Sequence, residues 1–299
     1  MKLPADLIQK LGEVHEEAGS WLETLDDLFR RLEARWDIRV TGLVEELSYH
    51  VVAFAEGADG APYILKLGPP TPESLQEIAA LSYYDGDGIC RLLATDPEAT
   101  AMLLERVQPG VSLWNSQDDD LATRACADLL LQLWCPVDDE SAFRSLHSWT
   151  RALPEYLERH PKDGPLPHDI TQKSTILLEE LLQEDNEPVL LHGDLHHGNI
   201  LTATHQPFLA IDPKGIVGAR AFDVTAFLRN PEGITQRSDF GRVLDRRITV
   251  FSERLELSPR EIARWSYVEC ALSSCWYFRE TGKSAQSTQT MAAALERWL

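Results

Sequence analysis

The hydrophobic period of the chain changes near residue 37. Up to that point the apolar side chains recur at steps of three and four, as Leu25, Leu28 and Leu32 do, and this spacing predicts helix over residues 4–36. Beyond it the apolar residues gather in short runs rich in β-branched and aromatic side chains, which predict strands. These runs cover residues 38–44, 47–55, 63–67, 89–95 and 101–107.

One helix is predicted among these strands. Thr71 is suited to cap a helix, Pro72 fits its first turn, and Glu73 places an acid near the positive end of the helix dipole. We therefore expect a helix over residues 71–84. The predicted order is three strands, one helix and two strands.

The chain becomes mostly helical after Pro109 and Gly110. A small β-rich part thus precedes a larger helical part, which predicts an α+β fold with a junction at residues 105–112. We expect a helical extension over 1–36, a β-rich lobe over 37–108, and a helical lobe over 109–299. Helices are predicted at 119–135, 141–160, 170–184, 239–256, 259–279 and 286–298, with short apolar stretches at 189–191 and 208–211.

Charge narrows the range of partners. The 299 residues include 48 Asp and Glu against 28 Lys and Arg, a formal net charge of −20. Such a field opposes binding to nucleic acid or to an anionic membrane surface, and it attracts cationic small molecules. The chain has five cysteines, an odd number, and no two of them are spaced as Cys-x-x-Cys. This pattern favours reduced thiols over disulfides or a metal site. Because the sequence has neither a membrane-length apolar run nor a signal-peptide core, we expect a cytoplasmic protein.

The segment 192–201, HGDLHHGNIL, carries the strongest chemical signal. It follows an apolar strand, and four residues separate Asp194 from Asn199. A kinase catalytic loop has this spacing: its Asp receives the proton of the substrate hydroxyl and its Asn holds Mg²⁺. Asp212 follows the next apolar strand, so we predict Asp194 as the catalytic base and Asn199 with Asp212 as Mg²⁺ ligands.

A second group of candidates lies in the β-rich part. Lys66 stands inside the apolar strand 63–67, where an ammonium group is costly unless an anion meets it. The phosphates of a nucleotide would meet it, and Glu77 on the next helix is placed to pair with it. Glu105 and Val107 end the last predicted strand, and we expect backbone groups there to face an adenine.

These residues, in this order, resemble the aminoglycoside phosphotransferase and choline kinase-like superfamily, most closely its streptomycin 6-kinase and hydroxyurea phosphotransferase group. The likeness spans essentially the whole chain. It implies a bilobal protein-kinase-like fold and transfer of a phosphoryl group from ATP, with Mg²⁺, to the hydroxyl of a small molecule. The segments that carry it are LLHGDLHHGNIL (190–201), AIDPKGIVG (210–218), AFDVTAFLRNP (221–231) and LLERVQPGVSLW (103–114).

The chain departs from kinases at the expected phosphate loop, residues 42–50. This loop has one glycine and two acids, and no Gly-x-Gly-x-x-Gly occurs in it. Ser48 and neighbouring backbone N–H groups are the candidates for phosphate contacts.

Other polar residues have both structural and functional interpretations. His192, His196 and His197 lack metal-site spacing, so bracing of the loop is the preferred interpretation, with His196 also able to line the substrate pocket. Asp223 is interpreted as a buried brace of the same loop. Glu269 lies among apolar and aromatic residues, and we expect a cationic group of the substrate beside it.

The sequence therefore predicts a kinase that phosphorylates a cationic aminocyclitol of the streptomycin type. Hydroxyurea or another metabolite is the alternative acceptor. A nucleotide-binding protein without catalysis is the alternative class, which the presence of all five polar kinase positions opposes. No Gly-x-Ser-x-Gly elbow surrounds a serine, which opposes a hydrolase.

Overall fold

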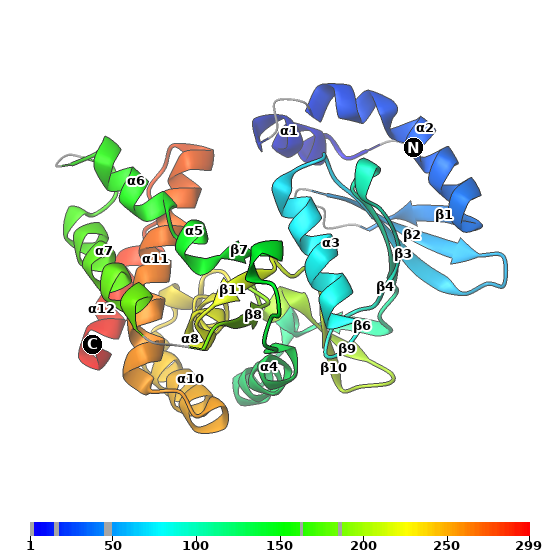
Figure 1. Cartoon of the computed structure of the whole chain (residues 1–299). Helices are drawn as coiled ribbons and strands as arrows, with labels where there is room; N and C mark the ends of the chain where they lie inside the picture. Colours follow the sequence, from blue (N-terminus) through cyan, green and yellow to red (C-terminus); the bar gives the residue numbers. More distant parts are fainter. Residues whose placement is uncertain (1–2, 15–17, 45–49, 162–163, 185–186) are drawn as a thin grey trace. The chain divides into compact units, whose positions relative to one another are not determined.

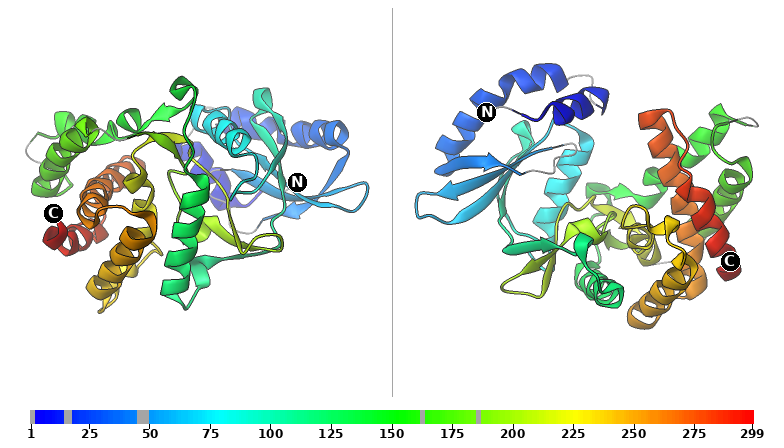
Figure 2. Two further views of the ribbon diagram at one scale, coloured as in Figure 1. Left: turned by 60° about the horizontal axis from the view of Figure 1, so that its bottom comes forward. Right: turned by 180° about the vertical axis from the view of Figure 1, so that it is seen from behind.

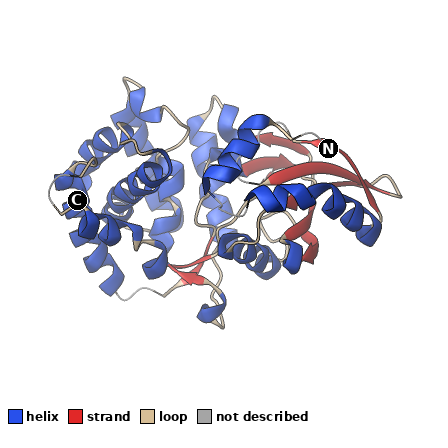
Figure 3. Cartoon of the chain, turned by 90° about the horizontal axis from the view of Figure 1, so that it is seen from above, coloured by secondary structure: helices blue, strands red, loops and turns tan. Residues whose placement is uncertain are grey.

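The chain divides into two compact units, Met1–Gly110 and Val111–Leu299 (Figure 1). The computed structural model describes residues 3–14, 18–44, 50–161, 164–184 and 187–299. The strands of the first unit form one continuous sheet, whereas the second unit is mostly helical (Figure 3). The predicted α+β organisation is confirmed.

The first unit is built on a five-stranded antiparallel sheet in the order β1-β2-β3-β5-β4. The central strand β3 pairs with β2 and β5, so that Lys66 lies opposite Val52 on one side and Met102 on the other. The elements are α1 (Ala5–Val14), α2 (Ala18–Trp36), β1 (Ile38–Leu43), β2 (Val51–Gly57), β3 (Pro62–Leu67), α3 (Pro72–Tyr84), β4 (Leu92–Asp96) and β5 (Ala101–Glu105).

The two faces of this sheet are used differently. Successive side chains of a strand point to opposite faces, and Leu65 and Leu67 belong to the apolar core that also contains Leu28 and Leu32 of α2. Lys66, between those leucines, therefore points to the other face. Burial of the apolar face is the main stabilising contribution in this unit, at about 25 cal/mol per Å² removed from water.

Helix α3 begins as the sequence predicts. The Thr71 hydroxyl accepts a hydrogen bond from the Ser74 N–H at 3.1 Å, and Pro72 occupies the first turn. The helix ends where Asp85 adopts a left-handed conformation with φ 47°. Its start and its Glu77-bearing face are thus set by local sequence.

The second unit is a set of packed helices around two small sheets. Helix α10 packs on α4, and α11 packs on α7 and α12 (Figure 2). The sheets have the orders β10-β9-β6 and β7-β11-β8. The longer helices are α4 (Asp119–Leu133), α6 (Ala152–Arg159), α7 (His168–Gln183), α10 (Phe240–Leu255), α11 (Pro259–Thr281) and α12 (Ser287–Leu295). Two short helices are α8 (Arg220–Asp223) and α9 (Thr225–Leu228). The strands are β6 (Pro109–Ser112), β7 (Arg144–Ser145), β8 (Val189–Leu191), β9 (Ile200–Ala203), β10 (Phe208–Ala210) and β11 (Ile216–Gly218).

The continuous helix predicted over residues 141–160 is wrong. The segment instead contains β7, α5 (Leu146–Trp149) and α6. Arg144 pairs in parallel with Ile216 of β11, and the Ser145 hydroxyl then caps a new helix by accepting the Ser148 N–H at 3.2 Å. Pairing with a distant strand thus overrides the local helical pattern.

Other boundaries also differ. The predicted helix over 4–36 corresponds to α1 and α2, and residues 15–17 between them lie outside the described residues. The strand predicted at 47–55 begins at Val51 in the structure, while positions 45–49 are not described.

All five cysteines have free thiols. No helix of the described residues has the length and apolarity that a membrane crossing needs.

A buried arginine joins several elements of the second unit. The Arg247 side chain is 1% exposed and forms an ion pair with Asp119 of α4 at 2.5 Å. Its Nη1 also donates to the carbonyl oxygens of Phe227 at 3.1 Å and Asn230 at 2.6 Å. A buried guanidinium is tolerated because these acceptors replace the lost water. Arg247 therefore ties α10 to α4 and to the chain that follows α9.

We expect Arg247→Met to lower the free energy of unfolding by about 3 kcal/mol. The substitution leaves the carbonyl oxygens of Phe227 and Asn230 without their donor, and it leaves the Asp119 carboxylate without its ion-pair partner. Urea denaturation checks the value. Arg246→Met is the matched control, since the neighbouring Arg246 forms an exposed ion pair with Asp120 at 2.7 Å, and such pairs contribute little. Equal urea midpoints for the two variants would contradict the structural role of Arg247.

Candidate active site

The predicted pair of Lys66 and Glu77 is present in the first unit. The Lys66 Nζ lies 2.5 Å from the Glu77 Oε1, and the two side chains are 3% and 7% exposed. The strand alternation of β3 and the capped start of α3 bring these groups together on one face of the sheet. Each of the two buried groups is the other's ion-pair partner, which offsets part of the cost of removing them from water.

The other candidates of the first unit are placed less fully. The Glu105 N–H donates to the Arg91 carbonyl oxygen at 2.9 Å, and the Glu105 carboxylate accepts the Arg91 N–H at 3.2 Å. The backbone N–H of Glu105 is therefore already engaged by the protein. Val107 is buried just beyond the end of β5. Ser48 lies outside the described residues.

In the second unit, the buried carboxylate of Asp223 holds the start of the catalytic loop. It accepts hydrogen bonds from the His192 N–H at 2.9 Å, the Gly193 N–H at 2.6 Å and the Trp134 indole N–H at 3.1 Å. Burial raises the pKa of Asp223 to about 6, and these donors oppose that rise. The interpretation of Asp223 as a brace agrees with this geometry.

Gly193 allows the loop to turn immediately after β8. Its φ is +80°, and a Cβ at this position would lie 2.7 Å from the Ile216 Cδ1 and 3.0 Å from the Lys214 Cβ. Only glycine combines that backbone conformation with such a close approach. The turn places Asp194 beside the 212–215 segment.

The imidazole of His192 links the loop to the strand that delivers Asp212. Its Nδ1 accepts the Asp194 N–H at 3.2 Å, and its Nε2 lies 2.8 Å from the Ile211 carbonyl oxygen. Burial lowers the pKa of His192 to about 4, so the ring is neutral at pH 7. A neutral ring with its proton on Nε2 satisfies both contacts.

Two backbone hydrogen bonds strengthen this link. The Ile211 N–H donates to the Asn199 carbonyl oxygen at 3.0 Å, and the Lys214 N–H donates to the His192 carbonyl oxygen at 2.6 Å. The Asn199 Nδ2 donates to the Asp194 carbonyl oxygen at 3.0 Å, which turns its Oδ1 the other way. Asp212 has a left-handed backbone with φ 60°, a strained conformation that is enriched at functional sites. The structure thus joins the segments of Asp194, Asn199 and Asp212.

The Asp194 carboxylate has a cation beside each oxygen. The Arg229 Nη2 lies 3.6 Å from Oδ1, and the Lys214 Nζ lies 3.8 Å from Oδ2. These distances are too long for hydrogen bonds. The side chain of Asp194 is 23% exposed, so solvent or a ligand can reach it.

Glu269 does have a cation beside it, although the cation belongs to the chain itself. The Glu269 Oε1 lies 3.0 Å from the Arg229 Nε, and the Glu269 side chain is 5% exposed. Burial raises the pKa of Glu269, and the charge of Arg229 opposes the rise. The sequence predicted a substrate cation beside Glu269, whereas the structure places the side chain of Arg229 there.

The two remaining histidines brace the loop in different ways. The His196 Nδ1 accepts the Gly198 N–H at 3.0 Å, and its ring meets the edge of Trp114. His197 stacks on Phe227 with ring centroids 3.8 Å apart, and its Nε2 lies 3.3 Å from the Arg247 Nη2. Burial lowers the pKa of both rings, that of His197 to about 3.

Within the described chain, no group of three or more His, Cys, Asp and Glu side chains lies close enough together to hold a metal ion.

Sequence reasoning missed Lys214, Arg229 and Arg247. The first two lie in quoted motifs, and Arg229 directly follows the apolar residues Ala226–Leu228. The reasoning that singled out Lys66, a lone cation next to apolar residues, would also have found Arg229. Arg247 carries no such signal, because Asp245 and Arg246 directly precede it in α10 and a run of charges is typical of a solvated helix face.

A cavity of about 720 Å³ in the second unit adjoins this cluster. Arg229 forms part of its wall and is at the same time 3.6 Å from Asp194. Glu232 is its only described acidic wall residue, and Trp114 and Tyr277 are its aromatic ones. Hydroxyl and amide side chains supply much of the remainder: Asn230, Thr235, Gln236, Ser273, Ser284, Gln286, Ser287, Thr288 and Thr290.

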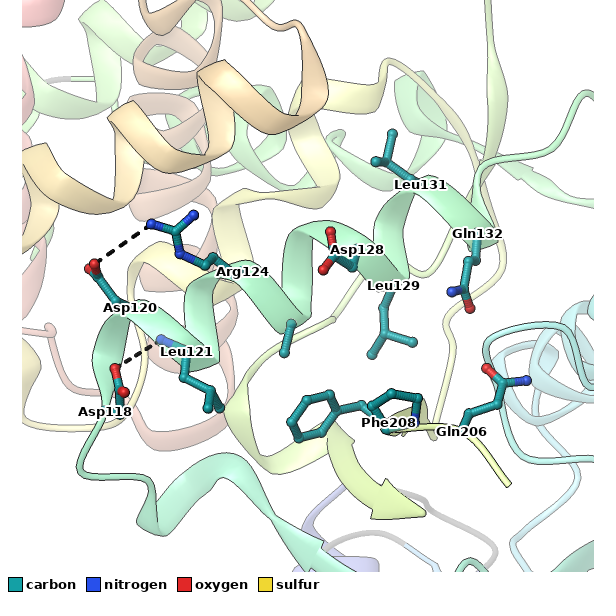
Figure 4. A pocket seen from close by; sticks show the side chains of 12 residues that line it. Asp118, Asp120, Leu121, Arg124, Asp128, Leu129, Leu131, Gln132, Gln206 and Phe208 are labelled. Carbon is teal, nitrogen blue, oxygen red and sulfur yellow. Dashed lines mark hydrogen bonds and ion pairs between the residues drawn. The ribbon is translucent and has the colours of Figure 1, made fainter. Parts of the chain in front are cut away.

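A second cavity, of about 800 Å³, lies between α4 and the β9–β10 hairpin (Figure 4). Leu121, Leu129 and Phe208 point into it, and Asp118, Asp120 and Asp128 stand along α4 beside it. It contains no candidate catalytic residue.

The chain is similar in sequence to several named kinases. The model of the aminoglycoside/hydroxyurea antibiotic resistance kinase family matches residues 35–282. The streptomycin 6-kinase of Streptomyces glaucescens is 32% identical over 289 residues, covering 94% of this chain and 92% of that one. The hydroxyurea phosphotransferase of Kitasatospora aureofaciens is 32% identical over 237 residues, covering 77% of this chain and 68% of that one.

The fold is also similar to that of solved kinases. A choline kinase of Streptococcus pneumoniae superposes with a TM-score of 0.62 at 12% identity, covering 92% of this chain and 98% of that one. At that identity the likeness concerns the fold alone. Since the family model spans most of the chain and a relative 32% identical covers nearly all of it, the chain belongs to the aminoglycoside/hydroxyurea antibiotic resistance kinase family.

Proposed function

We propose that this phosphotransferase transfers the γ-phosphoryl group of ATP to a hydroxyl of a cationic aminocyclitol of the streptomycin type, and that it confers antibiotic resistance by doing so. The observation that carries the proposal is the hydrogen-bonded link, through His192, between the segments of Asp194, Asn199 and Asp212. The names of the streptomycin 6-kinase relatives support the acceptor class. The net charge of −20 supports a cationic one.

Asp194 is the proposed base. Its exposed carboxylate orients the acceptor hydroxyl and accepts its proton. The acceptor oxygen then forms a bond to the γ-phosphorus, the bond from that phosphorus to the bridging oxygen breaks, and ADP leaves with the electron pair. Because Arg229 and Lys214 stay beyond hydrogen-bond distance, both oxygens of Asp194 retain lone pairs for the hydroxyl.

Asn199 and Asp212 are the proposed Mg²⁺ ligands. An amide oxygen and a carboxylate are hard donors, and Mg²⁺ is usually held by one or two such groups together with phosphate oxygens and water. The orientation of the Asn199 amide fits this role, since its nitrogen is engaged by the Asp194 carbonyl oxygen. When bound, the ion neutralises charge on the phosphates.

Lys66 is proposed to bind the α- and β-phosphates of ATP, with Glu77 fixing its position. A buried ion pair such as Lys66–Glu77 adds little stability compared with packed apolar residues of similar size. Binding of a ligand by Lys66 is therefore a better explanation for the pair than stability. Val107 and the backbone beyond Glu105 are proposed to meet the adenine, and Ser48 to contact phosphate. We expect the enzyme to act in the cytoplasm, without nucleic-acid or membrane partners.

The 720 Å³ cavity is the proposed acceptor site. Its volume is suited to a drug-sized molecule, and it shares Arg229 with the proposed base. Of the described residues, none forms an ion pair with Glu232, so this carboxylate is available to a substrate cation. Hydroxyurea, the alternative acceptor, would leave most of the cavity unfilled.

We expect Asp194→Ala to lower kcat by about 10³-fold, because the hydroxyl loses the group that orients it and takes its proton. Initial rates with streptomycin and ATP measure the effect, and calorimetric titration should find ATP affinity unchanged. Asp223→Ala is the contrast, since it leaves three donors without an acceptor and should lower thermal stability as well as turnover. An Asp194→Ala enzyme with kcat within about tenfold of the wild type contradicts the assignment.

We expect Glu232→Gln to raise the KM for streptomycin by about fivefold without changing kcat, since a partly solvated charge contact is worth about 1 kcal/mol. Steady-state kinetics at saturating ATP measure the split. Glu179→Gln is the control, because Glu179 is an exposed acid of α7 outside the cavity and the substitution changes the net charge equally. The same KM for both variants would remove Glu232 from the acceptor site.

A further inference from the structure

Arg229 connects two carboxylates of very different exposure. It follows α9, and its guanidinium lies 3.0 Å from the Glu269 Oε1 and 3.6 Å from the Asp194 Oδ1. Glu269 is 5% exposed on α11, whereas Asp194 is 23% exposed on the catalytic loop. The guanidinium thus makes its shorter contact with the buried carboxylate and its longer contact with the reactive one.

The unequal distances have a chemical consequence. A guanidinium placed at full hydrogen-bond distance would occupy the lone pairs of Asp194, which are needed to accept the hydroxyl proton. At 3.6 Å, Arg229 still attracts the carboxylate and restrains its orientation. Glu269 keeps the guanidinium at that distance, because a buried carboxylate competes strongly for the nearest cation.

Lys214 does not replace Arg229 in this role. Its ammonium lies 3.8 Å from the other oxygen, on a flexible side chain that is 39% exposed. The Arg229 side chain is exposed to a similar extent, at 34%, but its Nε lies 3.0 Å from the buried Glu269 carboxylate, and none of the described residues gives Lys214 a second anionic contact of this kind. Of the two cations, Arg229 is therefore the one that determines where Asp194 points.

We propose that Arg229 is a positioning residue for phosphoryl transfer, held by Glu269 so that it orients the Asp194 carboxylate without binding its proton-accepting lone pairs. The inference rests on the proposed function of Asp194. In this proposal Glu269 does not make the substrate contact that the sequence predicted, but acts indirectly by holding Arg229. It also explains a buried ion pair beside the cavity that packing does not require.

The experiment compares Arg229→Gln with wild type in steady-state kinetics with streptomycin and ATP. Because a small misplacement of a catalytic group can cost about 10²-fold, we expect kcat to fall by about that factor while the KM for ATP is unchanged. Arg237→Gln is the matched control, since Arg237 is 53% exposed and pairs with Asp239 instead. It should retain wild-type kcat.

A rescue measurement separates positioning from folding. The Arg229 side chain is 34% exposed and lines the cavity, so a small cation can enter in its place. We expect guanidinium chloride, at concentrations well below denaturation, to raise the kcat of Arg229→Ala by about tenfold and to leave Arg237→Ala unchanged. If Arg229→Ala does not fold, the kcat of Arg229→Gln decides.

Glu269→Gln tests the second half of the inference. Without the buried charge, Arg229 is free to move onto Asp194, so kcat should fall although both catalytic groups remain. A kcat of Arg229→Gln within about threefold of wild type, or a Glu269→Gln enzyme with wild-type kcat, overturns the positioning role. A wild-type protein that phosphorylates neither streptomycin nor hydroxyurea overturns the proposed function as well, so the two failures are distinguishable.

Discussion

The candidate site depends on one buried imidazole. His192 accepts a hydrogen bond from the backbone of Asp194 and contacts the carbonyl oxygen of Ile211, the residue before Asp212. The Lys214 ammonium, 3.8 Å from the Asp194 carboxylate, joins the same two segments at a longer distance. The ring can do this only while neutral, and its complete burial keeps it so. The Asp223 carboxylate accepts a hydrogen bond from the backbone N–H of His192, so two buried groups set the relative position of the segments that carry the candidate carboxylates Asp194 and Asp212.

Much of the site was predictable because it follows local rules. The apolar neighbours of Lys66 in the predicted strand indicated that an anion meets its ammonium group, and the capping signature at Thr71 predicted the helix that carries Glu77. The spacing of Asp194 and Asn199 predicted a loop of the kinase catalytic type. The pairing of Arg229 with Glu269 was not predictable in the same way, because 40 positions separate the two residues and only the packing of α11 brings them together. The break within residues 141–160 has the same origin, a pairing with a strand far along the chain.

The described acidic residues of the second unit are not gathered at the cavity, although a net charge of −20 alone would suggest that they are. Several acids of the second unit pair with arginines of other helices, including Asp119 with Arg247, Asp128 with Arg254, and Glu180 and Glu184 with Arg264. These pairs connect α4 to α10 and α7 to α11. The cavity beside Asp194 has a single described acid on its wall. Many of the acidic residues therefore stabilise the packing of helices, and together they set the long-range electrostatic field. Recognition of a ligand in the cavity depends instead on individual wall residues.

The cavity wall has a consequence for how the enzyme can change over generations. It is built largely from two stretches of chain, 230–236 and 284–291, whereas the loop and strands that hold Asp194, Asn199 and Asp212 occupy 189–218. Of the described wall residues, Arg229 is the one that forms an ion pair with Asp194. Under the proposed function, substitutions in the two stretches can therefore change acceptor preference while the stretch that carries Asp194, Asn199 and Asp212 stays intact, so a lineage of such enzymes can move from one acceptor to another.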